Sequence, residues 1–363
     1  DQGAGRVDRK AHVATLRGDL EGHARIAVRG QQQEGSHPLA AHAHVRGVVQ
    51  VAQLEQQAVA HQERRHVQVV GRGQLRDETH TAVASRGQVE PHARILLALA
   101  TQIETGDAAA LDAAAIQGFE TELMRLSDKY TVVAVDLPGH GLSAGPKAAP
   151  PTVPGQPAPP LIDLQHVAQR IAKLIRDEKL APAVVVGHSI GGQIAAWVPL
   201  VDRDAVRGVL LVDSSLSPPS LSDGDRTRLR ADLKRDMIST LRRFFAPMTS
   251  NATQLDKMVA SAQRVAPAVF MGYIDSAVDS ELDDKVSNIQ VPVHLLAGPL
   301  LIADNNDQTK TKLSLQALGV TNIRSFTYDY FPTSKHWLFW DEPERFRDDM
   351  DRFLSSVTRP AVS

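Results

Sequence analysis

The sequence predicts an α/β fold with a mostly parallel sheet of the kind that carries an inserted helical cap. Apolar runs of strand length alternate with longer helical patterns over residues 119–363. A G-x-S-x-G pentapeptide directly follows one of these runs and precedes a helical pattern. A charged helical stretch without strand signals separates two later runs. Alternating strands and helices of this kind are typical of parallel βαβ units.

The N-terminal segment, residues 1–118, differs from this pattern in composition. It contains no Phe, Tyr, Trp, Met or Asn and a single lysine, but nine of the fourteen histidines. Aromatic side chains supply much of the buried area of a core, so an ordinary independent domain is not expected here. Three interpretations stay open: a disordered or low-complexity extension, a segment read in an incorrect frame of a GC-rich gene, or a genuine small domain.

Composition excludes several classes of protein. With 363 residues and 42% apolar residues the chain can bury a large core, and a net charge of -2 gives no general attraction to nucleic acid. The absence of cysteine excludes disulfides and thiolate metal sites. No apolar run approaches the roughly 20 residues of a membrane span, and the N-terminus has no signal-peptide pattern. We expect a cytoplasmic protein that spans no membrane, and the oligomeric state stays open.

The elements expected along the ordinary part of the chain follow from its periodicity. A buried parallel strand is predicted from the continuous apolar run at 130–135, and further strands are predicted at 183–186, 209–212, 291–297 and 323–328. Amphipathic helices are predicted at 119–127, 161–180 and 343–354. The segment 146–160 holds seven prolines and is predicted to be a loop. Residues 216–285 are predicted to form the helical cap.

The pentapeptide Gly187-His188-Ser189-Ile190-Gly191 has the flanking sequence that gives such a motif chemical meaning. The run 183–186 precedes it, and helix-compatible residues follow. In a strand–turn–helix context, the serine backbone is strained and its neighbours must be small. Ser189 is therefore predicted to stand at the carboxyl end of its strand as a nucleophile. The amide N–H of Ile190 is predicted to point at a developing oxyanion.

A serine hydroxyl needs a neighbouring base, which the sequence offers at two positions. Only His294 and His336 lie downstream of Ser189. His294 falls within a predicted strand, which favours a packing role. His336 follows the last predicted strand and precedes the closing helix, so His336 is the predicted base.

The base in turn needs an acid to orient it, and three aspartates are candidates. Loops at the carboxyl ends of parallel strands meet over one crevice, so the acid is sought directly after the later strands. Asp304 ranks first and Asp307 second, both after the strand at 291–297. Asp213, directly after the strand at 209–212, ranks third.

Three motifs over about residues 119–354 resemble those of the α/β-hydrolase superfamily. They are the Asp136–Ser143 turn (D-L-P-G-H-G-L-S), the Gly187–Gly192 elbow (G-H-S-I-G-G) and the segment that begins at His336 (H-W-L-F-W-D-E-P-E-R-F). The resemblance implies a serine-dependent enzyme of the esterase and lipase-like branch, with no metal or organic cofactor. Dehalogenases and epoxide hydrolases resemble this pattern but carry Asp in place of Ser189. The expected substrate is a small-molecule ester of small or medium size, cleaved through an acyl-enzyme.

Two departures from the family pattern leave other functions open. The family's acid would fall at Leu301, so Asp304 requires a small insertion. The family's His-Gly oxyanion loop would fall near Leu111, but residues 106–118 contain no such motif. One alternative is therefore a catalytically impaired protein with a binding role or no activity. Another is a cofactor-free haloperoxidase or carbon–carbon hydrolase that uses the same triad.

Two further patterns in the sequence could indicate a cofactor or a metal. Residues 139–144 match the dinucleotide fingerprint G-x-G-x-x-A, but proline-rich sequence follows where a helix should begin. The histidines at positions 42, 44, 61 and 66 lack the spacing of a zinc site with a third ligand. The sequence therefore predicts neither a dinucleotide nor a metal.

Overall fold

The computed structural model describes residues 81–84, 94–99, 122, 125–141, 143–149 and 158–358, with the first two segments described as backbone. All of them belong to one unit of the chain, residues 65–363.

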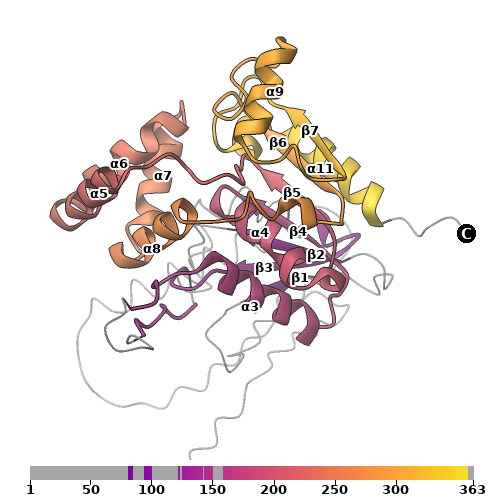
Figure 1. Cartoon of the computed structure of the whole chain (residues 1–363), viewed down its shortest axis with the longest axis horizontal. Coiled ribbons are helices and arrows are strands. Elements are labelled where there is room, and N and C mark those ends of the chain that lie inside the picture. Colours follow the sequence, from indigo (N-terminus) through magenta and orange to yellow (C-terminus); the bar gives the residue numbers. More distant parts are fainter. Residues whose placement is uncertain are drawn as a thin grey trace, which may run out of the picture. The chain divides into compact units, whose positions relative to one another are not determined.

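A seven-stranded sheet forms the centre of this unit (Figure 1). Its order is β1-β3-β2-β4-β5-β6-β7; β1 pairs antiparallel with β3, and every other pair is parallel. The strands are β1 (Thr81–Ala84), β2 (Arg94–Leu99), β3 (Thr131–Asp136), β4 (Ala183–His188), β5 (Val206–Val212), β6 (Val293–Ala297) and β7 (Phe326–Tyr330). This arrangement confirms the predicted fold class, because each of the five expected strands overlaps a strand that pairs in parallel with a neighbour.

The central strands are buried on both faces. Every residue of β4 is buried, so side chains that point to either face of the sheet are covered. Helix α4 (Ile190–Val201) packs on β4 and β5, and α3 (Leu164–Asp177) packs against α4. Helix α11 (Pro343–Thr358) packs on β5 and β6. These layers explain why the strands are continuous apolar runs, without the alternation of half-exposed strands.

Two strands come from the compositionally unusual part of the chain. β1 and β2 both lie within residues 1–118, and β2 inserts between β3 and β4. The register pairs Ala98 of β2 with Gly187 of β4, so β2 ends at the edge of the sheet where Ser189 precedes α4. The histidines at positions 42, 44, 61 and 66 lie outside the described residues.

The predicted cap consists of four helices between β5 and β6, which lie together in Figure 1. They are α5 (Asp223–Arg235), α6 (Met237–Phe245), α7 (Ala252–Ala262) and α8 (Pro267–Val278). Helix α5 is held to α8 by charge, because Arg230 contacts Asp275 and Arg226 bonds Asp279 at 3.0 Å. The side-chain caps Ser222 of α5, Asp236 of α6 and Asn251 of α7, together with these ion pairs, account for helices that carry many charged residues.

The connections at the carboxyl edge of the sheet complete the unit. Helix α9 (Gln308–Ala317), which the sequence pattern had not indicated, joins β6 to β7. The short α10 (Leu338–Asp341) follows β7 and leads into α11. In the proline-rich segment, the described residues 146–149 and 158–160 form neither helix nor strand, as expected.

Candidate active site

Ser189 lies in a sharp turn between β4 and α4. Its φ of 54° and ψ of -127° are in a region that residues with side chains seldom adopt. Its N–H donates to Val212 O at 3.0 Å, and its own carbonyl accepts from the Ser214 hydroxyl at 2.7 Å. These bonds to the end of β5 hold the strained turn in place. Strain of this kind persists only where the surroundings over-determine it, which is typical of functional sites.

The glycines around Ser189 are required by close backbone packing. A Cβ on Gly187 would lie 2.1 Å from the carbonyl oxygen of Gly191. A Cβ on Gly192 would lie 2.3 Å from the hydroxyl oxygen of Ser214. Neither position has room for a side chain, so small residues are required at Gly187, the first glycine of the G-x-S-x-G pattern, and at Gly192, directly after it.

His336 is held by a buried carboxylate that the sequence ranked last. Its Nδ1 donates to Asp213 Oδ2 at 2.7 Å, and Asp213 is 2% exposed. The other oxygen, Oδ1, accepts the main-chain N–H of Gly298 at 2.9 Å. Both oxygens of Asp213 therefore have donors, as a buried carboxylate requires. With Nδ1 occupied, the remaining ring nitrogen of His336, Nε2, is left for proton exchange.

The first-ranked acid, Asp304, is not brought to His336. Its side chain is 37% exposed, and it accepts from the Asn306 N–H and the Lys310 ammonium. The hydrogen bond from Lys310 is the main reason that the pKa of Asp304 is lowered. Asp307, ranked second, caps α9 by accepting from the main chain of Thr309 and Lys310. The structure thus pairs His336 with Asp213 in place of either expected partner, because β6 is followed by a loop that turns to the surface.

His294 has the packing role that was predicted for it. It lies in β6, where Nδ1 is 2.7 Å from the Thr327 hydroxyl and Nε2 is 3.2 Å from Asp329. Its ring stacks on Phe353 of α11 with a centroid separation of 5.4 Å. Burial lowers the pKa of His294, which favours the neutral ring.

Ile190 begins α4, so its N–H has no acceptor within the helix. The amino end of the helix also carries the positive end of its dipole, which favours a negative charge there. The expected second donor would come from the chain after β2. Residues 100–121, including the position near Leu111, lie outside the described residues.

The glycine-rich turn after β3 supports the cap. Tyr273 of α8 donates its hydroxyl to Pro138 O at 3.0 Å and makes an edge contact with the ring of His140. Gly139 has a φ of 79°, and a Cβ there would lie 2.7 Å from a methyl of Val269. Burial lowers the pKa of His140 from 6.5 to about 4. The turn therefore packs closely against α8, and its buried histidine is neutral. The residues that follow the turn, 143–149, form no helix that could hold a dinucleotide.

The cap also contacts the segment that carries His336. The His336 N–H donates to Met248 O, in the short 3-10 turn (Ala246–Met248) that follows α6, at 3.1 Å. An aromatic group continues this contact, because Trp337 packs edge-on against Phe245 and His336. The cap and the predicted base are thus joined by one main-chain bond and by apolar packing.

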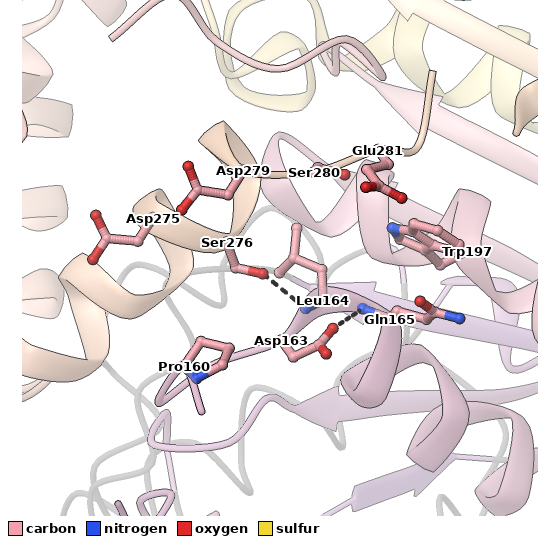
Figure 2. Close-up of a pocket in the computed structure, with 10 residues that line it drawn as sticks. All are labelled: Pro160, Asp163, Leu164, Gln165, Trp197, Asp275, Ser276, Asp279, Ser280 and Glu281. Atoms are coloured by element: carbon pink, nitrogen blue, oxygen red, sulfur yellow. Dashed lines mark hydrogen bonds between the residues drawn. The ribbon is translucent and has the colours of Figure 1, made fainter. Parts of the chain in front are cut away.

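A separate cavity of about 250 Å³ lies between α3, α4 and α8 (Figure 2). Its walls include four carboxylates, and each has a partner elsewhere: Asp163 caps α3, Asp275 and Asp279 pair with arginines of α5, and Glu281 pairs with Lys285. Ser276 accepts the N–H of Leu164 across it. None of Ser189, His336 and Asp213 lines this cavity, so it is distinct from the candidate active site.

Two further properties concern only the part of the chain that the structure describes. There, no three His, Asp or Glu side chains are grouped so that they could hold a metal ion. No helix among the same residues is both long and apolar enough to cross a bilayer.

Sequence reasoning undervalued or missed three features of this site. Asp213 directly follows β5, just as Ser189 directly follows β4. This shared position at a strand end is the sequence signal that favours Asp213 as the acid. Ser214, adjacent to it, was not considered. His188 carried no signal beyond its place in the pentapeptide.

Comparisons with known proteins agree with this architecture. The sequence model of the alpha/beta hydrolase family matches residues 109–349. The chain is 23% identical over 243 residues to the pimeloyl-[acyl-carrier protein] methyl ester esterase of Pseudoalteromonas atlantica, covering 62% of this chain and 84% of that protein. It is 35% identical over 95 residues to the 2-(acetamidomethylene)succinate hydrolase of Mesorhizobium japonicum, covering 26% of this chain and 30% of that protein.

Solved structures extend the likeness over more of the chain. The enol-lactonase of Burkholderia xenovorans superposes with a TM-score of 0.59 at 15% identity, covering 76% of this chain and 96% of that one. At this identity the likeness concerns the fold. With the family match extending over most of the sheet, the cap and the candidate site, the chain belongs to the alpha/beta hydrolase family.

Proposed function

We propose that the protein is a serine hydrolase that cleaves a small or medium carboxylic ester through an acyl-enzyme. Ser189 is the nucleophile, His336 the base and Asp213 the acid that orients it. The observation that carries the proposal is the 2.7 Å bond between His336 Nδ1 and the buried carboxylate of Asp213. It fixes the ring so that Nε2 is the free nitrogen, which is the state a serine hydrolase needs.

The reaction follows from these roles. Ser189 Oγ attacks the ester carbonyl carbon and passes its proton to His336 Nε2. The oxyanion accepts a hydrogen bond from the Ile190 N–H at the start of α4. His336 then protonates the leaving alkoxide, and the alcohol departs. Water attacks the acyl-serine with His336 again as the base, which releases the carboxylic acid and restores Ser189.

The comparisons favour ester chemistry within this family. Relatives of the chain are named as a methyl ester esterase and, by fold, an enol-lactonase, and a lactone is a cyclic ester. The aromatic side chains Phe245 and Trp337, which link the cap to His336, are suited to an apolar acyl or alcohol group. No described feature favours the haloperoxidase or carbon–carbon hydrolase alternatives over ester cleavage.

The direct test is hydrolysis of p-nitrophenyl acetate and butyrate by the full chain. We expect the Ser189→Ala variant to lose at least about 10³-fold in kcat, because the remaining site can only bind the ester and polarise it. Ser220→Ala removes an exposed hydroxyl of the cap connection and is expected to leave the rate unchanged. A folded wild-type protein without activity, or equal activity in Ser189→Ala, would leave the catalytically impaired alternative in place.

A further inference from the structure

His188, the residue before Ser189, makes a direct bond to the main chain of His336. Its ring Nε2 lies 2.8 Å from the His336 carbonyl oxygen. A carbonyl oxygen can only accept a hydrogen bond, so Nε2 of His188 carries the proton and donates it. His188 is 5% exposed, and burial together with the neighbouring His336 lowers the pKa of His188 well below 6.5. The ring is therefore neutral and is present as the Nε2–H tautomer.

This bond joins two segments that are far apart in the chain. His188 is the last residue of β4, which is buried along its whole length. His336 lies in the irregular segment between β7 and α10. The rings of the two histidines are also in contact, with centroids 4.5 Å apart.

Other described bonds to this irregular segment come from different parts of the fold, among them the bond from the His336 ring to Asp213 and the bond from the Phe331 N–H to Ala297 O. The His336 N–H bonds Met248 of the cap, and the Lys335 N–H bonds Asp341 of α10 at 2.8 Å. Among the described hydrogen bonds, the one from His188 is therefore the bond that ties this segment to the residue next to the nucleophile. Catalytic groups that must exchange a proton need this kind of support, because a displacement of about 1 Å can cost about 100-fold in rate.

We propose that His188 is a positioning residue: it holds the main chain of His336 so that the His336 ring stays in register with Ser189. The expected effect of His188 on kcat rests on the proposed function. Its effect on the position of His336 does not depend on that function. The side chain itself takes no proton during the reaction. Its contribution is the donor at Nε2 and the volume of the ring.

Two variants separate the donor from the volume. His188→Leu fills a similar space without a donor, and His188→Gln places an amide N–H near the position of Nε2. We expect His188→Leu to lower kcat for p-nitrophenyl butyrate about 10- to 100-fold, with KM changed less than about 3-fold. His188→Gln is expected to recover kcat to within about 3-fold of the wild type.

A matched control comes from the other buried strand histidine. His294→Gln alters a histidine of β6 that bonds Thr327 and Asp329, so it is expected to lower stability without changing kcat. If His188→Leu keeps full kcat, or if His188→Gln is as slow as His188→Leu while both fold, the proposal is overturned.

A spectroscopic measurement keeps the proposal testable even if the protein hydrolyses no ester. The Nδ1 proton of His336, bonded to Asp213, is expected to give a downfield NMR resonance that disappears in His336→Ala. We expect this resonance to shift or broaden in His188→Leu and to be retained in His188→Gln and His294→Gln. An unchanged resonance in folded His188→Leu would show that His188 does not position His336, whatever the activity.

Discussion

Asp213 follows β5 and Asp304 follows β6 at the same edge of one sheet, but the surroundings of the two side chains differ. Asp213 is the first residue after β5, has a φ of 43° and is buried with a donor on each oxygen. Asp304 lies further along its loop, is exposed and pairs with Lys310. Parallel strands bring their carboxyl ends together, and Asp213 is held there directly at the end of β5. Asp304 lies seven residues after the end of β6, in a loop whose own bonds hold it beside Lys310.

The largest effect is expected from removing the charge of the buried aspartate. Asn at position 213 tolerates the positive φ, but it replaces an acceptor of the His336 Nδ1–H and favours the wrong ring tautomer. We expect Asp213→Asn to lower kcat for p-nitrophenyl butyrate about 10⁴-fold while circular dichroism shows a folded protein. Asp304→Asn is the matched control and should change kcat less than about 3-fold. The reverse order of effects would show that the comparison assigns the acid incorrectly.

Burial also affects the pH dependence of the free energy of unfolding, through His140. His140 has a pKa of about 4 in the folded protein because it is buried, against 6.5 without burial. Between these values the unfolded chain binds a proton that the folded chain does not, so stability falls as the pH decreases. This residue should account for a loss of about 2 to 3 kcal/mol between pH 7.5 and 4.5.

Urea denaturation at several pH values measures this loss in the wild type and in His140→Phe. We expect the variant to lose less stability over the same range, with the remainder due to groups such as His188 and His294, whose pKa values burial also lowers. Parallel curves for the two proteins would contradict a buried, neutral His140.

The smallest of these effects is expected at Gly298, which lies between Asp213 and the segment that carries His336. Gly298 donates its N–H to Asp213, and a Cβ there would lie 3.0 Å from Lys335 O. We expect Gly298→Ala to displace the segment that carries His336 by a few tenths of an ångström and to lower kcat about 10-fold. Gly145→Ala, where a Cβ would meet nothing within 4 Å, is the control. An unchanged kcat in Gly298→Ala would show that this segment tolerates the shift.

The fold was largely predictable because its central strands, such as β4 and β5, are buried along almost their whole length. Continuous apolar runs such as those of β4 and β5 are hard to place anywhere except the centre of a covered sheet. β1 and β2 were not predicted, because the aromatic-free composition of residues 1–118 argued against a core contribution from that part. The residues after Arg94 in β2, Ile95 to Leu99, are nevertheless all apolar. The place of β2 in the sheet follows from its pairing with β3 and β4, which a single short run does not reveal.

The candidate site was predictable where local sequence determines geometry. The glycines beside Ser189 predict the sharp turn between β4 and α4. The position of His336 after the last strand places this histidine at the carboxyl edge of the sheet. The partner of His336 depends on the paths of two loops, which periodicity does not encode. The bond from His188 depends on tertiary contact across 148 positions of the chain, for which no local pattern exists.

The most direct test of the account is covalent labelling of the serine with a fluorophosphonate, followed by intact mass and peptide mapping. We expect one adduct on the peptide that contains Ser189 in the wild type, formed at a similar rate in Asp304→Asn and far more slowly in Asp213→Asn. No adduct in the folded wild type, or slow labelling in Asp304→Asn with normal labelling in Asp213→Asn, would contradict a nucleophile at Ser189 served by His336 and Asp213.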